Sequence, residues 1–228
     1  MPVNAAKARP GWTFWGAVLW LAVIVVSAAT AGWWAVPASD AMDWDNPGVA
    51  PGTRVDKAVL QNADEAEEGP YVYRLGTDTM GRDVTSRLIY CARVSLLVGL
   101  LAPVIGFILG GILGFLAGYF RGRLDSIIVA AMDVILAFPG IVLLLALTFY
   151  LGPSLRNLII ALGSLAIPAF CRVARAKTLM LCELEFVQAA RLTGAGNLSI
   201  IVREIIPNVI VPMAAYALLV VSFMIMAE

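Results

Sequence analysis

Long apolar blocks, separated by polar stretches of very different length, dominate the pattern of residues along the chain. An α-helix rises about 1.5 Å per residue, so about 20 apolar residues cross the roughly 30 Å of hydrocarbon in a bilayer. The pattern predicts membrane-spanning helices at residues 11–36, 95–119, 127–151, 155–171 and 209–226. We therefore expect an all-α fold, a polytopic membrane helical bundle in which these five spans follow one another.

The first apolar block, residues 11–36, has two interpretations. It follows two basic residues and ends on a pair of tryptophans, which is typical of a span bounded by membrane interfaces. The alternative is a cleaved secretory signal with Ala29-Thr30-Ala31 as its cleavage motif. We expect a retained anchor, with residues 1–10 as a short tail before it.

Residues 37–94 form the longest polar stretch, which is rich in acids and interrupted by Pro-Gly pairs. This composition predicts an irregular or partly extended loop. From about Thr85 to Val98 the apolar residues recur on one helical face, which predicts an interfacial helix that leads into the second span. Asp78 or Asp83 can cap that helix.

Glycines recur every four residues along the second span, at Gly106, Gly110, Gly114 and Gly118. Positions four apart share one face of a helix, and glycine lets another backbone approach that face closely. The face packs inside this chain or contacts a partner subunit, and the sequence leaves both open.

The third span, residues 127–151, is interrupted by Pro139-Gly140, which predicts a kink. Asp133 lies inside it, and an acid within a span is a candidate functional residue. Asp133 and Pro139 are therefore candidates for lining a path through the membrane. The alternative for Asp133 is a structural role, as a snorkelling or capping side chain near the polar end of the span.

The polar segment 172–208 contains two helical patterns. The residues that share one face are Phe186, Ala189, Ala190 and Thr193 in the first pattern, and Leu198, Ile201, Val202 and Ile205 in the second. The Gly-Ala-Gly run at 194–196 separates the two helices, Asn197 can cap the second, and Pro207 ends it. We expect a helical hairpin between two spans.

Composition changes the picture mainly by exclusion. Hydrophobic residues make up 61% of the chain and charged residues 14%, and histidine is absent. The lack of histidine removes the usual general base and the commonest metal ligand, and the three cysteines show no ligand spacing. None of the three lysines follows a glycine, so the chain has no phosphate-binding P-loop. We expect no catalytic residue and no metal site, and a net charge of zero offers no footprint for nucleic acid.

Basic residues predict the orientation, because they favour the cytoplasmic flanks of membrane spans. They gather before the first span, in the turn at 120–126 and in the segment 172–208, which fall on one side if every span crosses once. The acidic stretch 37–73 falls on the other side. We expect a cytoplasmic N-terminus, an external loop at 37–94 and a cytoplasmic segment at 172–208, in the inner (cytoplasmic) membrane of a cell.

Two sequence blocks resemble a known family. The run EFVQAARLTGAGNLSIIVREIIPN at 185–208 resembles the coupling loop of ABC importer permeases, whose pattern is E-A-A-x-x-x-G followed thirteen residues later by proline. The run LGTDTMGRDVTSRLIYCARVSL at 75–96 resembles the segment before the second span in dipeptide, oligopeptide and nickel importers, in the second of their two permeases. Shorter pieces at 117–119, 133–139, 151–153 and 172–176 agree, so the resemblance covers about residues 70–228. Gln188 departs from the pattern, since it stands where the coupling motif usually has Glu.

The resemblance implies a type I ABC importer transmembrane domain, with residues 95–228 as the permease core. It implies a sister permease, two ATPase subunits that hold ATP and magnesium, and a solute-binding protein outside, while this chain holds no cofactor. The coupling contact to the ATPase would be made by Glu185, Phe186, Gln188, Ala189, Ala190, Arg191, Gly194, Ala195, Arg203 and Pro207. The residues of the external motif are Gly76, Thr77, Asp78, Gly81, Arg82 and Asp83. Similar proteins continue into a sixth span, which we expect beyond Glu228.

The resemblance predicts a permease subunit of an ATP-driven peptide importer, which works by alternating access. Within the family, the alternatives are a permease for nickel, haem or another solute. Outside the family, the alternatives are a membrane anchor subunit of an enzyme complex and a passive channel.

Overall fold

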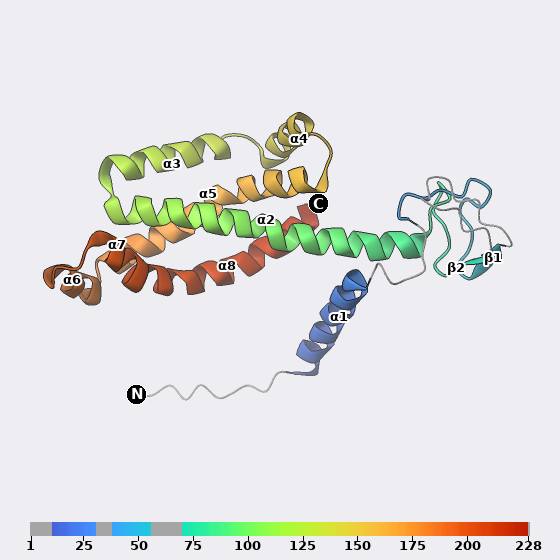
Figure 1. Ribbon diagram of the computed structural model, residues 1–228, viewed down its shortest axis with the longest axis horizontal. Coiled ribbons are helices and arrows are strands. Elements are labelled where there is room, and N and C mark those ends of the chain that lie inside the picture. Colours follow the sequence, from blue (N-terminus) through green and yellow to red (C-terminus); the bar gives the residue numbers. More distant parts are fainter. Residues whose placement is uncertain (1–10, 31–37, 56–69, 228) are drawn as a thin grey trace. The chain divides into compact units, whose positions relative to one another are not determined.

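The computed structural model describes residues 11–30, 38–55 and 70–227, and it is mainly helical (Figure 1). The chain divides into two compact units, Met1–Leu96 and Leu97–Glu228, and helix α2 (Val84–Phe120) runs across the boundary between them. Four helices of the described residues are long and apolar enough to cross a membrane, or five if the bent pair α3–α4 counts as one span. The predicted all-α membrane bundle is thus confirmed, with small strands added.

Helix α1 (Trp12–Ala29) is the first of these candidate spans. Apolar residues surround it on all sides, and Ala28 is its one buried residue. A helix that is apolar all round and uncovered by protein is suited to a lipid environment. The predicted tail, residues 1–10, and the tryptophan pair of the predicted span lie outside the described residues.

The polar stretch of the first unit folds into a small block, residues 38–55 and 70–83, here called the polar block. Strands β1 (Thr53–Val55) and β2 (Tyr71–Tyr73) pair antiparallel within it, with Thr53 opposite Tyr73. Tyr73 is fully buried and its hydroxyl donates to Oδ2 of the buried Asp43 at 2.7 Å. Desolvation raises the pKa of Tyr73, and the hydrogen bond to the Asp43 carboxylate raises it further. The hydrogen-bonded pair of Tyr73 and Asp43 thus occupies the buried centre of the polar block, where other small domains have apolar side chains.

The residues of the external motif all lie in the polar block. Gly81 has a φ of +73°, and a Cβ added there would lie 1.9 Å from the carbonyl oxygen of Asp43, so the turn requires glycine. Asp78 accepts from the backbone N–H and the guanidinium of Arg82 and pairs with Arg87 at 2.7 Å. Desolvation opposes the charge of Asp78, but the hydrogen bonds from Arg82 and Met80 prevail and lower its pKa to about 2. The carboxylate therefore stays charged over the whole neutral range.

Helix α2 contains both the helix expected from about Thr85 to Val98 and the second span, because a single helix of 37 residues runs from Val84 to Phe120. The first part leads into the span without a break. No glycine or proline stands between Thr85 and Val98 to interrupt the backbone hydrogen bonds. Asp83 caps this helix, since its Oδ1 accepts from the N–H of Thr85 at 2.9 Å and its Oδ2 accepts from Ser86.

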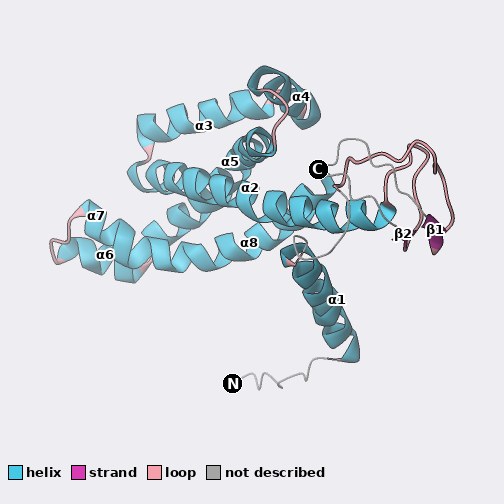
Figure 2. Cartoon of the chain, turned by 45° about the vertical axis from the view of Figure 1, so that its right-hand side comes forward, coloured by secondary structure: helices cyan, strands magenta, loops and turns pink. Residues whose placement is uncertain are grey.

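The second unit is a helical bundle built around α5 (Leu155–Cys182), which packs against α3 (Gly122–Leu136), α4 (Gly140–Leu151) and α8 (Ile206–Ala227) (Figure 2). Helix α6 (Glu185–Leu192) and helix α7 (Asn197–Ile200) follow α5. A π-helical turn, η2 (Ile201–Ile205), joins α7 to α8. The α6–α7 end of the bundle lies opposite the end that carries α4 (Figure 1).

Three boundaries of this bundle differ from the expectation. The predicted span 127–151 is broken rather than kinked, because α3 and α4 meet at 86°. Pro139 lies at the break, and a proline disfavours helical backbone at the residue before it. Helix α5 runs past residue 171, the predicted end of the fourth span, to Cys182, and no glycine or proline stands in between to interrupt its backbone hydrogen bonds.

Pro207 does not end the second hairpin helix as expected, since Asn197–Ala227 is continuous and forms a single candidate span. Proline has no N–H to donate to the ladder. The π-helical turn, Ile201–Ile205, lies just before this position, and the side-chain amide of the next residue, Asn208, donates to the carbonyl of Glu204 at 2.6 Å. Local π-helical adjustments of this kind allow a membrane helix to contain proline.

Candidate functional site

The hairpin formed by α6, the turn Thr193–Gly196 and α7 is the site that the coupling resemblance indicates. Its turn closes α6 with two hydrogen bonds, from the N–H of Ala195 to the carbonyl of Ala190 and from the N–H of Gly194 to the carbonyl of Arg191, both 3.0 Å. This is a Schellman motif, which needs a left-handed residue after the helix. Gly194 supplies it with a φ of +83°. The predicted break between the two helices is therefore present, and its geometry is defined by one glycine.

Few residues attach α6 to the rest of the unit. Val187 is its single buried residue, and the side-chain amide of Gln188 donates to the carbonyl of Glu183 at 3.1 Å. The helical pattern predicts Phe186 on the shared apolar face, but Phe186 is exposed. Helix α6 has only eight residues, and Val187 is buried because it lies against the end of α5. The periodic pattern of so short a helix does not predict which residue is buried.

Most of the predicted coupling residues gather on the exposed surface of this hairpin. Glu185, Phe186, Gln188, Ala189, Arg191 and Gly194 are exposed, and Ala190 and Ala195 are half-buried. Arg203 and Pro207 lie apart from them, on η2 and α8. Two further apolar side chains project from the hairpin, since Leu192 is 89% exposed and Leu198 is 75% exposed. An apolar tip of this kind is typical of a surface that another protein covers.

Tyr119, at the end of α2, contacts both arms of the hairpin. Its hydroxyl donates to Oδ1 of Asn197 at 2.8 Å, and the guanidinium of Arg191 lies 5.2 Å from the centre of its ring. Asn197 therefore does not cap α7 with its side chain as expected; Gly196 is the N-cap residue, without a side-chain cap. Tyr119 is not among the predicted site residues. Its position in the sequence, a phenol at the polar end of a glycine-lined span, is a signal that could have indicated it.

Ion pairs connect the helices near the hairpin. Arg175 on α5 makes a bidentate pair with Asp125 on α3, at 2.5 and 2.6 Å. Arg121, between α2 and α3, pairs with Glu183 after α5. Asp133 pairs with Arg172 at 2.7 Å, so the structure gives this acid a partner on α5. Two of these pairs connect basic residues of α5 to α3.

The glycine row faces α5 inside this chain. A Cβ added at Gly110 would lie 2.5 Å from the carbonyl oxygen of Ile167, and one at Gly114 would lie 2.5 Å from that of Cys171. Gly106 and Gly118 approach Ala166 and Thr178 in the same way. The sequence left open whether this glycine face packs inside the chain or contacts a partner subunit. In the structure it packs inside the chain, against α5.

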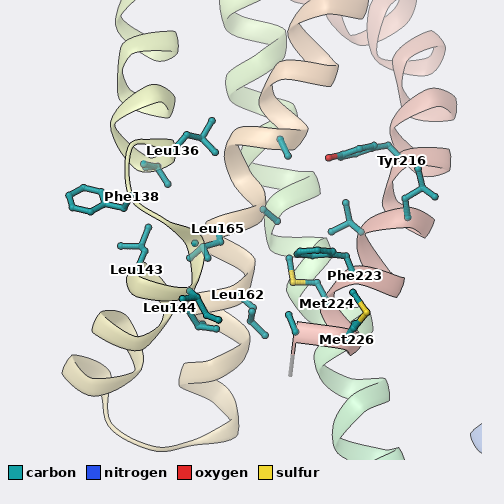
Figure 3. Close-up of a pocket in the computed structure, with 18 residues that line it drawn as sticks. Leu136, Phe138, Leu143, Leu144, Leu162, Leu165, Tyr216, Phe223, Met224 and Met226 are labelled. Carbon is teal, nitrogen blue, oxygen red and sulfur yellow. The ribbon is translucent and has the colours of Figure 1, made fainter.

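An apolar cavity of about 890 Å³ lies beside α5 and α8, at the break between α3 and α4 (Figure 3). Leu136, Phe138, Leu165, Phe223 and Met224 are among its lining residues, and Tyr216 is the one lining side chain with a polar atom. The two residues predicted to line a path, Asp133 and Pro139, are not among those that line this cavity. The described residues also contain no cluster of three or more side chains suited to hold a metal ion.

Comparison with known proteins identifies the class. Residues 110–228, just over half of the chain, match the family of binding-protein-dependent transport system inner membrane components. The chain belongs to this family, and the match includes the end of α2, from Gly110 to Phe120, and all of the hairpin. It is therefore an integral membrane protein of the kind that serves as the inner-membrane part of ABC importers.

Individual relatives add detail. The chain is 44% identical to a putative peptide transport system permease protein of Brucella suis over 153 residues, which cover 67% of this chain and 51% of the relative. It is 37% identical to a di/tripeptide transport system permease protein of Pseudomonas aeruginosa over 153 residues, 67% of this chain and 50% of the relative. It is 36% identical to a glutathione transport system permease protein of Pectobacterium atrosepticum over 146 residues, 64% and 48% of the two chains. The chain thus spans about half the length of the curated relatives it matches.

Proposed function

We propose that this chain is a permease subunit of an ATP-driven importer of peptides. The α6–α7 hairpin carries the proposal, because it combines exposed apolar side chains with a turn of fixed geometry and lies at one end of the bundle. The relatives that transport peptides, according to their names, support the substrate class.

In this function the hairpin docks onto an ATPase subunit, which binds ATP and magnesium, since this chain has no P-loop. Phe186, Leu192 and Leu198 supply apolar contact, and Glu185 and Arg191 supply charge. Helix α6 has eight residues, about 12 Å at the usual rise, so it can enter a groove as one rigid body. Closure of two ATPases then moves α5 and α8, which are covalently joined to the hairpin.

A sister permease completes the path, and a solute-binding protein delivers the peptide from outside. The apolar cavity between the α3–α4 break, α5 and α8 is a candidate part of that path. Its lining offers a single hydroxyl and no charge, so it suits passage of varied peptides better than tight recognition of one. We therefore place selectivity in the binding protein.

The experiment is co-expression of the chain with its partner subunits, followed by reconstitution into liposomes. We expect ATPase subunits to co-purify, and ATP to drive uptake of a radiolabelled dipeptide when the binding protein is present. The isolated chain should hydrolyse no ATP. Uptake that proceeds equally without ATP would overturn the proposal and favour a passive channel.

The proposed orientation places the polar block outside and the hairpin in the cytoplasm. Thr79 and Thr193 are both exposed, so each accepts a single cysteine in a chain whose three native cysteines are replaced. A membrane-impermeant thiol reagent should label the Thr79→Cys variant in intact cells and the Thr193→Cys variant only after the cells are broken. The reverse pattern would invert the orientation and exclude the coupling role.

A further inference from the structure

Tyr119 connects α2 to the hairpin, since its side chain contacts Asn197 and Arg191. Helices α5 and α8 are joined to the hairpin by the chain itself, whereas α2 ends at Phe120, far from it in sequence. The Tyr119 hydroxyl reaches Asn197 across 78 positions. The same ring lies under Arg191 in the last turn of α6. One side chain of α2 therefore contacts the hairpin on both sides of the Schellman turn.

The two contacts differ in kind, and together they define the position of the hairpin relative to α2. The hydrogen bond of 2.8 Å is directional, so it is lost when Asn197 turns or shifts by about an ångström. The contact of the guanidinium with the ring face tolerates sliding. The hydrogen bond therefore fixes the angle between the hairpin and α2, whereas the ring contact alone would hold the two together without fixing that angle.

The face of α2 next to Tyr119 lets such a movement reach the bundle. Gly118 packs directly on Thr178 of α5, so the two backbones are close at this level. The hydroxyl of Thr178 is fully buried and has no hydrogen-bond partner among the described residues. A shift of the α2 end along α5 therefore breaks no hydrogen bond of the Thr178 side chain. The other glycines of the row are in close contact with α5, so that a movement of α2 is passed on to α5.

We propose that Tyr119 is a positioning residue that transmits movement of the α6–α7 hairpin to α2 through its hydrogen bond to Asn197. The inference rests on the proposed importer function, and it adds a third helix to the two that the hairpin moves through the backbone. Tyr119 touches neither ATP nor the solute. It acts by keeping the angle of the hairpin and the position of α2 coupled, so that hydrolysis and opening of the path occur together.

The test uses the complete complex in liposomes and measures two quantities, the dipeptide transported per ATP hydrolysed and the amount of assembled complex. Tyr119→Phe removes the hydroxyl and keeps the ring under Arg191, and Asn197→Ala removes the acceptor. Each should lower the transported dipeptide per ATP about fivefold, the factor expected for loss of one hydrogen bond between two states. The double variant should be no worse than either single variant, because both remove the same bond.

Two further variants control the result. Asn197→Asp keeps an acceptor oxygen for the Tyr119 hydroxyl and should retain a wild-type ratio. Tyr150→Phe removes the hydroxyl of an exposed tyrosine at the end of α4 and should also leave the ratio unchanged.

If Tyr119 only stabilised the fold, its variants would give less assembled complex or a lower Tm. The complex that remains would then transport as much dipeptide per ATP as the wild type. That pattern would overturn the role of Tyr119 and leave the importer function standing. Failure of the importer function itself is distinguishable, because the wild-type complex would then show no ATP-dependent uptake before any variant is compared.

Discussion

The α2–α5 contact and the α6–α7 hairpin occupy the same unit and are built in opposite ways. Along α2, four glycines bring backbone against backbone, so that added Cβ atoms would lie less than 3.0 Å from α5. Around Gly194 and Gly196 the space is open, since an added Cβ would meet nothing within 4 Å at either position. Glycine serves close approach in the first region and backbone conformation in the second. Substitutions in the α2–α5 contact should therefore affect folding of the bundle. Substitutions in the α6–α7 hairpin should affect coupling in a bundle that still folds.

The largest expected effect is that of Gly114→Leu. The new side chain would lie against the carbonyl of Cys171 and the Cβ of Ala174, both in a helix that cannot yield locally. Overpacking of this kind typically costs about 1–3 kcal/mol and occasionally more, so we expect little monodisperse protein after extraction. Gly111→Ala is the control on the same helix, because its Cβ would lie 3.0 Å from the flexible end of Met213 and in ordinary contact with Phe115, at 3.7 Å, and its nearest atoms include no backbone atom of α5. Equal yields from the two variants would mean that the α2–α5 contact is looser than the structure shows.

Gly194→Val should give the next largest effect, on coupling rather than on folding. A left-handed residue other than glycine costs roughly 1–2 kcal/mol, and a branched side chain makes it worse. The Schellman turn should be lost, which re-aims α7 while the subunit still inserts and assembles. We expect ATP hydrolysis that continues without transport. Gly194→Asn is the matched variant, since asparagine tolerates this conformation, and it should keep most of the wild-type transport per ATP. Wild-type transport by Gly194→Val would exclude the coupling role of the hairpin.

Arg175→Lys sharpens the comparison at the level of side chains. The guanidinium of Arg175 binds both carboxylate oxygens of Asp125 and is two-thirds covered, and lysine cannot reproduce that fork. We expect the free energy of unfolding to fall by about 1–2 kcal/mol, read as a lower Tm in detergent. A double-mutant cycle with Asp125→Asn isolates the pair. Additive effects of the two changes would show that the pair does not hold α3 to α5.

Glu183→Gln should have the smallest effect. Its partner Arg121 is about half exposed and Glu183 itself is more exposed, so water and salt screen the pair. Exposed pairs contribute about 0–1 kcal/mol, and we expect a Tm within experimental error of the wild type. A decrease as large as that of Arg175→Lys would show that this helix end is covered in the assembled protein.

Local patterns in the sequence predicted the parts of the fold that depend on neighbouring residues. The spacing of the glycines on one face and the break at Gly194 follow from helical geometry and backbone conformation, which single residues specify. The ion pairs of α5 could not be predicted in this way. They join Arg175 to Asp125 and Arg172 to Asp133, which lie 50 and 39 positions away from their arginines.

The candidate site shows the same division. Its exposed residues were predicted from the coupling pattern, whereas its attachments were missed. Val187 is buried because α5 ends beside it, and Asn197 accepts from Tyr119 instead of capping α7. The helix continues through Pro207 just after a π-helical turn, a local adjustment that a proline in a sequence does not signal.

The most direct test of the central claim is photo-crosslinking from the tip of the hairpin. A photoreactive amino acid at Leu192, which is 89% exposed, samples whatever covers the hairpin in the membrane of living cells. The same amino acid at Thr79, in the polar block, serves as the control. We predict a crosslink from position 192 to an ATPase subunit that changes in yield when ATP is bound, and none to that subunit from position 79. A crosslink from position 192 to the solute-binding protein or to lipid alone would contradict the account.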